Sequence, residues 1–291
     1  MERARTDLAV EARDEYMEKY AREHGGEPDG IVFRERTESG VKISELEVTS
    51  EAGERTMGRA LGRYVTIEFG EIADFSSFSA LCSLCGRELR SLCGGAESAL
   101  ICGLGNACLA ADSIGPLALS HVLVTRALRE REPDIFKKSG FANVSAIAPG
   151  VGADTGFCAA DIVRAAAEKA NPDVIIAIDA LAARETRRLC RTVQLCTAGI
   201  SPGSGVGNAR TRLDEESVGA RVISVGVPTV VDVATLVRDA AGEGAKAESY
   251  AGLFVCPTDI DAQSARLARL IGYAVNIAFH NGYPIEEMML G

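Results

Sequence analysis

The sequence predicts an α/β protein with a doubly wound, mostly parallel β-sheet and a small antiparallel sheet near the N-terminus. Strand-like apolar runs alternate with helix-like segments from Ala99 to Val227, which is the pattern of successive βαβ units. The run Val174–Ile178 is short, continuous and β-branched, as expected of a parallel strand buried on both faces. Residues 31–69 instead alternate apolar and polar side chains, which is typical of antiparallel strands.

Length and composition favour one cytoplasmic domain spanning residues 1–291. A chain of 291 residues that is 47% hydrophobic can bury a sizeable core. Its net charge of -10 argues against nucleic acid as a direct partner. No apolar run approaches the roughly 18 residues of a membrane span, so no membrane association is expected. The charged N-terminus lacks the apolar core of a secretory signal.

The N-terminal third is expected to hold two helices and the small sheet. Leu8–His24 places apolar residues at helical spacing among many charges, which predicts an exposed amphipathic helix. Ala80–Cys93 is the second predicted helix, ended by a glycine pair. The strands of the small sheet, residues 31–69, are predicted at Ile31–Phe33, Val41–Val48 and Tyr64–Phe69.

The larger sheet follows from the remaining apolar runs. Helices are expected from about Asp112 to Arg129, over Cys158–Lys169 and over Asp261–His280. The strands between them are predicted at Ala99–Cys102, Val144–Ala148, Val174–Ile178, Leu189–Cys196 and Arg221–Val227.

Two acidic residues follow buried strands of this sheet. Asp179 comes directly after Val174–Ile178, and Asp112 follows Ala99–Cys102 by way of a glycine-rich segment. Catalytic groups of open α/β sheets gather beyond the carboxyl ends of the strands, so both side chains are expected in one crevice. Glycines after a strand let backbone N–H groups turn toward a ligand. The residues expected to form the cleft are Gly103, Gly105, Asn106, Gly205 and Asn208.

The two aspartates can be interpreted as a catalytic pair, as metal ligands or as helix caps. Two carboxylates at close range share protons, so one pKa rises and the other falls, and such a pair can activate water and protonate a leaving amine. The same pair could bind a divalent metal, for which a third protein ligand is usually needed. Either residue could instead cap a helix, Asp179 before the sequence ALAAR and Asp112 before a helix with Pro116 in its first turn.

Other chemistries find little support. A serine or cysteine nucleophile needs a histidine base, and neither His24, His121 nor His280 is placed for one. Nine cysteines, an odd number, are expected to be reduced in the cytoplasm. Cys82 and Cys85 are spaced for zinc but lack a second close pair, so they are interpreted as core residues. No metal or cofactor is expected.

A series of motifs resembles a known family. They are RTDLAVE (Arg5–Glu11), GRYVTIE (Gly62–Glu68), CGLGN with DSIGP (Cys102–Pro116), APGVGADTGF (Ala148–Phe157), IDALAAR (Ile178–Arg184), TVQ with GISPGSGVGN (Thr192–Asn208) and GVPTVVD (Gly226–Asp232). Their order and number resemble germination proteases, the spore endopeptidases that degrade small acid-soluble spore proteins. The resemblance covers most of the chain.

The resemblance implies an atypical aspartic endopeptidase with Asp112 and Asp179 as its catalytic pair. It also implies a fold similar to that of hydrogenase-maturing peptidases, a homotetramer, the cytoplasm of the spore core, and small acid-soluble spore proteins as substrates. Family members are zymogens that cut their own N-terminus. Here Arg5–Glu11 resembles that site, with the bond between Asp7 and Leu8 cut and residues 1–7 forming the pro-segment. A terminal segment of this kind is expected to be mobile enough to reach a cleft, although Thr6 or Asp7 could simply cap the first helix.

Some features depart from the family pattern. The expected pro-segment is short, Arg238–Leu253 is brief, and Cys196–Ile200 stands where an acidic turn is expected. These departures bear on zymogen control and oligomer packing more than on the chemistry. Two alternatives are kept beside this interpretation, a metal-dependent maturation peptidase of another cytosolic protein and an inactive relative that binds spore proteins.

Overall fold

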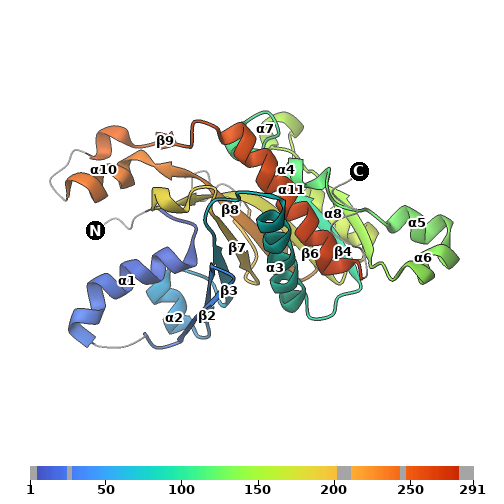
Figure 1. Ribbon diagram of the computed structural model, residues 1–291, viewed down its shortest axis with the longest axis horizontal. Coiled ribbons are helices and arrows are strands. Elements are labelled where there is room, and N and C mark those ends of the chain that lie inside the picture. Colours follow the sequence, from blue (N-terminus) through green and yellow to red (C-terminus); the bar gives the residue numbers. More distant parts are fainter. Residues whose placement is uncertain (1–4, 25–27, 202–210, 243–246, 282–291) are drawn as a thin grey trace.

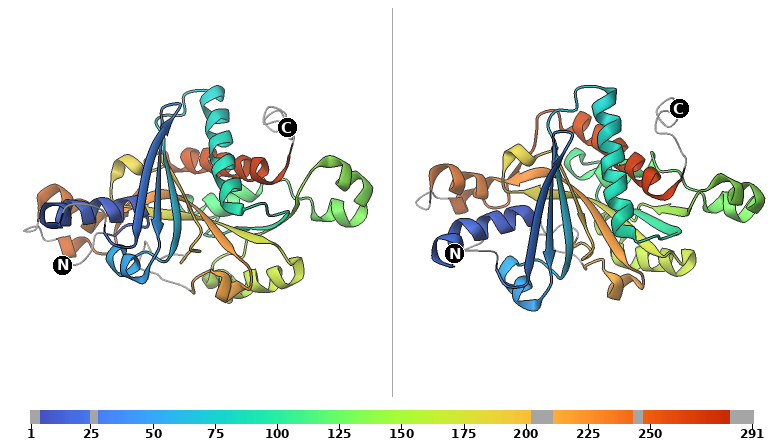
Figure 2. Two further views of the ribbon diagram at one scale, coloured as in Figure 1. Left: turned by 90° about the horizontal axis from the view of Figure 1, so that it is seen from below. Right: turned by 60° about the horizontal axis from the view of Figure 1, so that its bottom comes forward.

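A computed structural model describes residues 5–24, 28–201, 211–242 and 247–281. Within them, one nine-stranded sheet is covered by helices on both faces (Figures 1 and 2). The strands are β1 (Ile31–Glu38), β2 (Val41–Val48), β3 (Gly62–Glu68), β4 (Ser98–Gly103), β5 (Asn143–Ile147), β6 (Val174–Ala183), β7 (Thr192–Cys196), β8 (Val222–Asp232) and β9 (Phe254–Val255). The helices are α1 (Ala9–His24), α2 (Glu51–Met57), α3 (Phe75–Cys93), α4 (Ile114–Leu119), α5 (Arg126–Arg131), α6 (Pro133–Ser139), α7 (Gly152–Thr155), α8 (Ala159–Ala170), α9 (Glu215–Val218), α10 (Val233–Ala241) and α11 (Ile260–Phe279).

The sheet confirms the α/β class and shows how its two parts join. Its order is β1-β2-β3-β7-β8-β6-β4-β5, with β9 also on β8. The strands β5, β4, β6 and β8 pair in parallel, whereas the pairs from β8 through β7 and β3 to β1 are antiparallel. The predicted N-terminal strands therefore extend the main sheet rather than form a second one.

The direction of β7 differs from the simple alternation of strands and helices. Between the end of β6 at Ala183 and the start of β7 at Thr192 lies a short turn with one 3-10 helix, η2 (Thr186–Arg188). A parallel connection needs a crossover of a dozen or more residues, so this turn brings the chain back antiparallel. β7 pairs with both β8 and β3 and so links the parallel and antiparallel parts.

Two apolar layers sandwich the central strands. Side chains on β6 alternate between them: Ile176 and Ile178 pack in the cluster formed with α3 and α11, and Ile175 and Ala177 pack in the cluster with α8. Leu8 and Val10 belong to the second cluster, so the start of α1 lies on the α8 face. A third cluster packs Ala9 and Met57 of α2 against β2 and β3.

Three predicted segments differ in the structure. The helix expected up to Arg129 ends at Leu119, and Thr125 then bonds the edge strand β5 at Val144 before α5 and α6 form a projecting hairpin (Figure 1). The first turn of the helix predicted as exposed is buried from Leu8 to Glu11. No helix follows Asp179, because β6 continues to Ala183.

Among the helices in the described ranges, none combines the length and apolar character needed to cross a bilayer.

Candidate active site

Asp179 lies where β6 loses its neighbour β4. The last paired residues of these strands are Gly103 and Ile178, and the Leu104 N–H donates to the Ile178 carbonyl over 2.8 Å before the chain turns away. Asp179 is therefore inside β6, one residue beyond β4, rather than beyond the end of its own strand as predicted. The residue is 4% exposed, and its Oδ1 accepts the Ala180 N–H at 3.0 Å.

Asp112 reaches the same edge of the sheet through a tightly folded loop. It ends the 3-10 helix η1 (Ala110–Asp112), and the N–H of Asn106 donates to its carbonyl oxygen at 2.9 Å and to its Oδ2 at 3.0 Å. A β-carbon on Gly105, whose φ is +104°, would lie 2.2 Å from the Asp112 carbonyl oxygen. The N-cap position of α4 is occupied by Ser113, so Asp112 is not the helix cap.

The loop that carries Asp112 is fixed from three sides. A β-carbon on Gly115 would lie 2.1 Å from the Leu104 carbonyl oxygen and 2.6 Å from that of Ile178, so α4 packs directly on β6. Thr229 of β8 donates from Oγ1 to the Ala111 carbonyl at 2.6 Å, and Ser264 of α11 donates to the Ala110 carbonyl at 2.9 Å. These contacts hold the Asp112 loop at the same edge of the sheet as Asp179.

A buried thiol, that of Cys102, lies near Asp179. Burial raises the pKa of the Cys102 thiol, and the charge of nearby Asp179 raises it further. Cys102 is thus a protonated, apolar neighbour. Burial also raises the pKa of Cys82 to about 12, and both Cys82 and Cys85 pack in the core against β-strands. Among the described residues, no group of three or more His, Cys, Asp or Glu side chains is arranged to hold a metal ion.

The predicted cleft residues are only partly described. Gly103 is the last residue of β4, and Gly105 and Asn106 begin the loop that holds Asp112. Gly205 and Asn208 lie outside the described residues.

The N-terminal segment is docked rather than loose. The Asp7 N–H donates to the Ala182 carbonyl at 2.9 Å, and the Ala182 N–H donates to Asp7 Oδ2 at 2.8 Å. Leu8 is fully buried. Helix α1 begins at Ala9, and the Ala12 N–H bonds the Leu8 carbonyl, so neither Thr6 nor Asp7 caps the helix.

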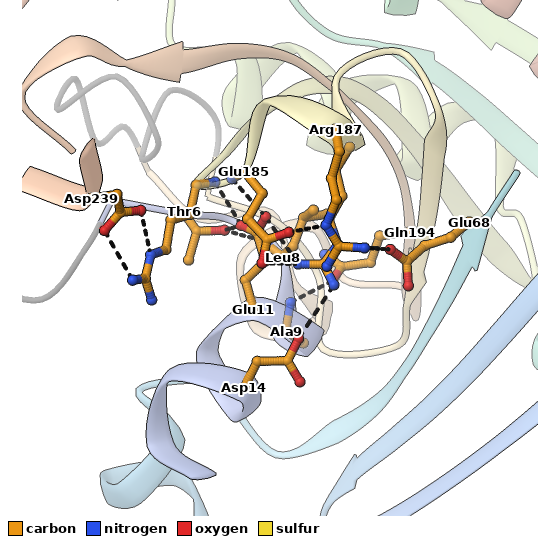
Figure 3. A network of polar contacts seen from close by, with 12 residues as sticks. Thr6, Leu8, Ala9, Glu11, Asp14, Glu68, Glu185, Arg187, Gln194 and Asp239 are labelled. Atoms are coloured by element: carbon orange, nitrogen blue, oxygen red, sulfur yellow. Dashed lines mark hydrogen bonds and ion pairs between the residues drawn. The ribbon is translucent and has the colours of Figure 1, made fainter. Parts of the chain in front are cut away.

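A buried ion cluster ties the same segment to the turn after β6 (Figure 3). Glu11 accepts the N–H groups of Arg184 and Glu185 at 2.7 and 3.0 Å. Arg188, with a side chain 3% exposed, donates to Glu11 at 3.2 Å and to Glu68 of β3 at 2.8 Å. Burial opposes the charge of Arg188, but the hydrogen bond to Glu68 and the neighbouring carboxylates raise its pKa overall.

The fold and these contacts together describe a class of protein. The chain is an α/β protein with two carboxylates at one edge of its sheet. The sequence profile of the germination protease family matches residues 9–242. The chain therefore belongs to this family and is a peptidase. A germination protease of Clostridium perfringens is 37% identical over 99% of this chain and 98% of its own length. That of Priestia megaterium is 42% identical over 81% of this chain and 65% of its own.

One solved structure also shows a likeness. A NiFe hydrogenase maturation protease from Thermococcus kodakarensis aligns with a TM-score of 0.36 and 17% identity, covering 65% of this chain and 99% of that one.

Proposed function

We propose that this chain is an endopeptidase that starts the degradation of small acid-soluble spore proteins, with Asp112 and Asp179 activating the attacking water. Membership of the germination protease family supports the substrate class. The observation that carries the assignment is the meeting of two carboxylate-bearing segments where β4 ends, with Asp179 on β6 and Asp112 folded back over Gly105. Carboxylates following neighbouring parallel strands occupy the usual catalytic edge of such sheets.

The chemistry needs one ionised and one protonated carboxyl group. The ionised carboxylate takes a proton from water as the water oxygen bonds to the carbonyl carbon of the peptide. The protonated partner gives its proton to the leaving nitrogen as the C–N bond breaks. The products are a carboxylate and an amine, and the proton taken from water restores the pair.

The proposal includes self-processing between Asp7 and Leu8, which removes residues 1–7 and leaves a new amino terminus at Leu8. The docking of Asp7 on Ala182, three residues along β6 from Asp179, supports it. We include in the proposal a homotetramer in the cytoplasm of the spore core, supported by family membership alone.

Incubation of the purified chain with a small acid-soluble spore protein, followed by mass analysis, tests this function. We expect internal fragments that begin after an acidic residue and before an apolar one. A spore protein that is bound but stays intact would contradict the proposal and support an inactive binding relative.

A further inference from the structure

Residues Thr6–Val10 cross the face of the sheet onto which Asp179 projects. Asp179, Leu181 and Ala183 alternate onto one face of β6, and Leu181 and Ala183 pack in the same cluster as Leu8 and Val10. The bond between Asp7 and Leu8 therefore lies on the Asp179 face.

The side-chain amide of Gln194 makes one hydrogen bond on each side of this bond. Its Nε2 donates to the Asp7 carbonyl oxygen at 3.1 Å, and its Oε1 accepts the Ala9 N–H at 2.7 Å. The backbone N–H of Ala9 can only donate, which fixes Oε1 on that side and directs the Nε2 donor at the Asp7 carbonyl. Gln194 is 6% exposed and lies on the central strand β7, so the donor is held in a largely dry, rigid setting.

Gln194 and Asp179 belong to one row of the sheet. Gln194 is in register with Gly226 of β8, and Gly226 is in register with Asp179 of β6. Registered residues on adjacent strands face the same side, and two strand spacings separate the backbones by roughly 10 Å. Gly226 contributes no side chain between them, and Leu181 fills the space above it. The row thus has a hydrogen-bond donor at one end and a carboxylate at the other.

Neighbouring contacts hold the backbone of the segment in place. The Asp7 carboxylate accepts the Ala182 N–H, and Arg59 donates from Nη2 to the Thr6 carbonyl at 2.6 Å. The Leu8 N–H donates to Thr6 Oγ1 at 3.0 Å. The carbonyl that Gln194 contacts is therefore presented in one orientation.

We propose that Gln194 positions and polarises the Asp7 carbonyl for self-processing, an assignment that rests on the proposed function. As the water oxygen bonds to the Asp7 carbonyl carbon, negative charge grows on the oxygen that Nε2 contacts, and a donor fixed there stabilises it. The Asp7–Leu8 C–N bond then breaks as the protonated carboxyl group of the pair gives its proton to the Leu8 nitrogen. The proton that the other carboxylate took from water replaces it in the pair.

The matched variant for a test is Gln194→Glu. It keeps an acceptor for the Ala9 N–H but replaces the Nε2 donor by a carboxylate oxygen at neutral pH. Removal of one such donor typically costs about a hundredfold or more in rate. The rate of appearance of the chain beginning at Leu8, followed by intact mass across a pH series, should fall by that factor at neutral pH.

Lowering the pH distinguishes two roles for Gln194, a hydrogen-bond donor to the Asp7 carbonyl and a purely structural contact. Once the carboxylate introduced by Gln194→Glu is protonated, it offers an O–H donor again, so the deficit of this variant relative to the original chain should shrink as the pH falls. Near-equal rates for the two chains at neutral pH would overturn the assignment, and so would a deficit that stays constant at every pH. An original chain that itself stays full length would overturn self-processing altogether, which distinguishes that failure from failure of the Gln194 assignment.

Discussion

Different sets of contacts hold the docked segment Thr6–Glu11 and the two-aspartate edge, which is the part of the sheet at the end of β4 that carries Asp112 and Asp179. The two-aspartate edge depends on backbone contacts between neighbouring strands, on glycines that let a loop fold against them, and on hydrogen bonds from Thr229 and Ser264 to that loop. The docked segment depends on backbone hydrogen bonds to β6 and on the side chains of Gln194 and Arg188, which lie more than 170 residues away along the chain. The two-aspartate edge is thus built from the sheet and its connecting loop, whereas the segment packs onto the face of that sheet.

The largest expected effect comes from changing the two-aspartate edge alone. Asp112→Asn or Asp179→Asn should reduce cleavage of a spore protein by about a thousandfold or more, because members of a catalytic unit act together. Initial rates of fragment formation measure the loss, and thermal unfolding should show the fold intact. Near-normal turnover by either variant would remove that aspartate from the mechanism.

The next effect concerns the ion cluster that holds the segment. Arg188→Met should lower the free energy of unfolding by roughly 3–5 kcal/mol, because buried Glu11 and half-buried Glu68 lose their shared cation. Arg187→Met is the matched control, since its side chain is 66% exposed and its ion pairs are worth at most about 1 kcal/mol. Urea unfolding measures both, and equal losses would contradict a special role for Arg188.

A smaller effect tests how the loop at Gly105 holds Asp112 at the two-aspartate edge. Gly105→Ala should reduce turnover by about a hundredfold, because its β-carbon would displace Asp112, and small misplacements of reacting groups are costly. Gly219→Ala is the control: its φ of +74° is also positive and disfavoured for alanine, but no atom lies within 4 Å of the added carbon. Equal activities of the two variants would show that the close approach of Gly105 to Asp112 does not matter for turnover.

The smallest expected effect is that of chelation. Strong chelators should change turnover by less than about twofold, because the carboxylates activate water themselves. Loss of activity that one added metal restores would instead favour the maturation-peptidase alternative.

Local sequence patterns were sufficient for much of the fold and for the expectation that Asp179 lies near the carboxyl end of β4. Continuous apolar runs predicted β4, β6 and β8. The acid directly after Val174–Ile178 predicted a functional carboxylate at the end of a parallel strand. The same local view missed that β6 continues past Asp179, since the residues after it, ALAA, suit either a helix or a strand.

The partners of the docked segment were beyond sequence reasoning, because their contacts depend on how distant strands pair. One signal was present: Gln194 is a polar residue inside the apolar strand β7, and a buried polar group must find a hydrogen-bond partner. Which partner it finds depends on the path of residues 5–9 across the sheet. Arg188 carried no such signal, because arginines in a TRR turn are ordinarily exposed.

The relation between the two-aspartate edge and the docked segment is tested most directly by mixing two chains. The original chain is incubated with an isotope-labelled Asp179→Asn chain under mildly acidic conditions, and the intact mass of each is followed. Because each chain docks its own Asp7–Leu8 bond on the face of its own Asp179, the original chain should shorten to begin at Leu8 while the labelled chain stays full length. Cleavage of the labelled chain at the same rate, or an original chain that remains uncut, would contradict the account.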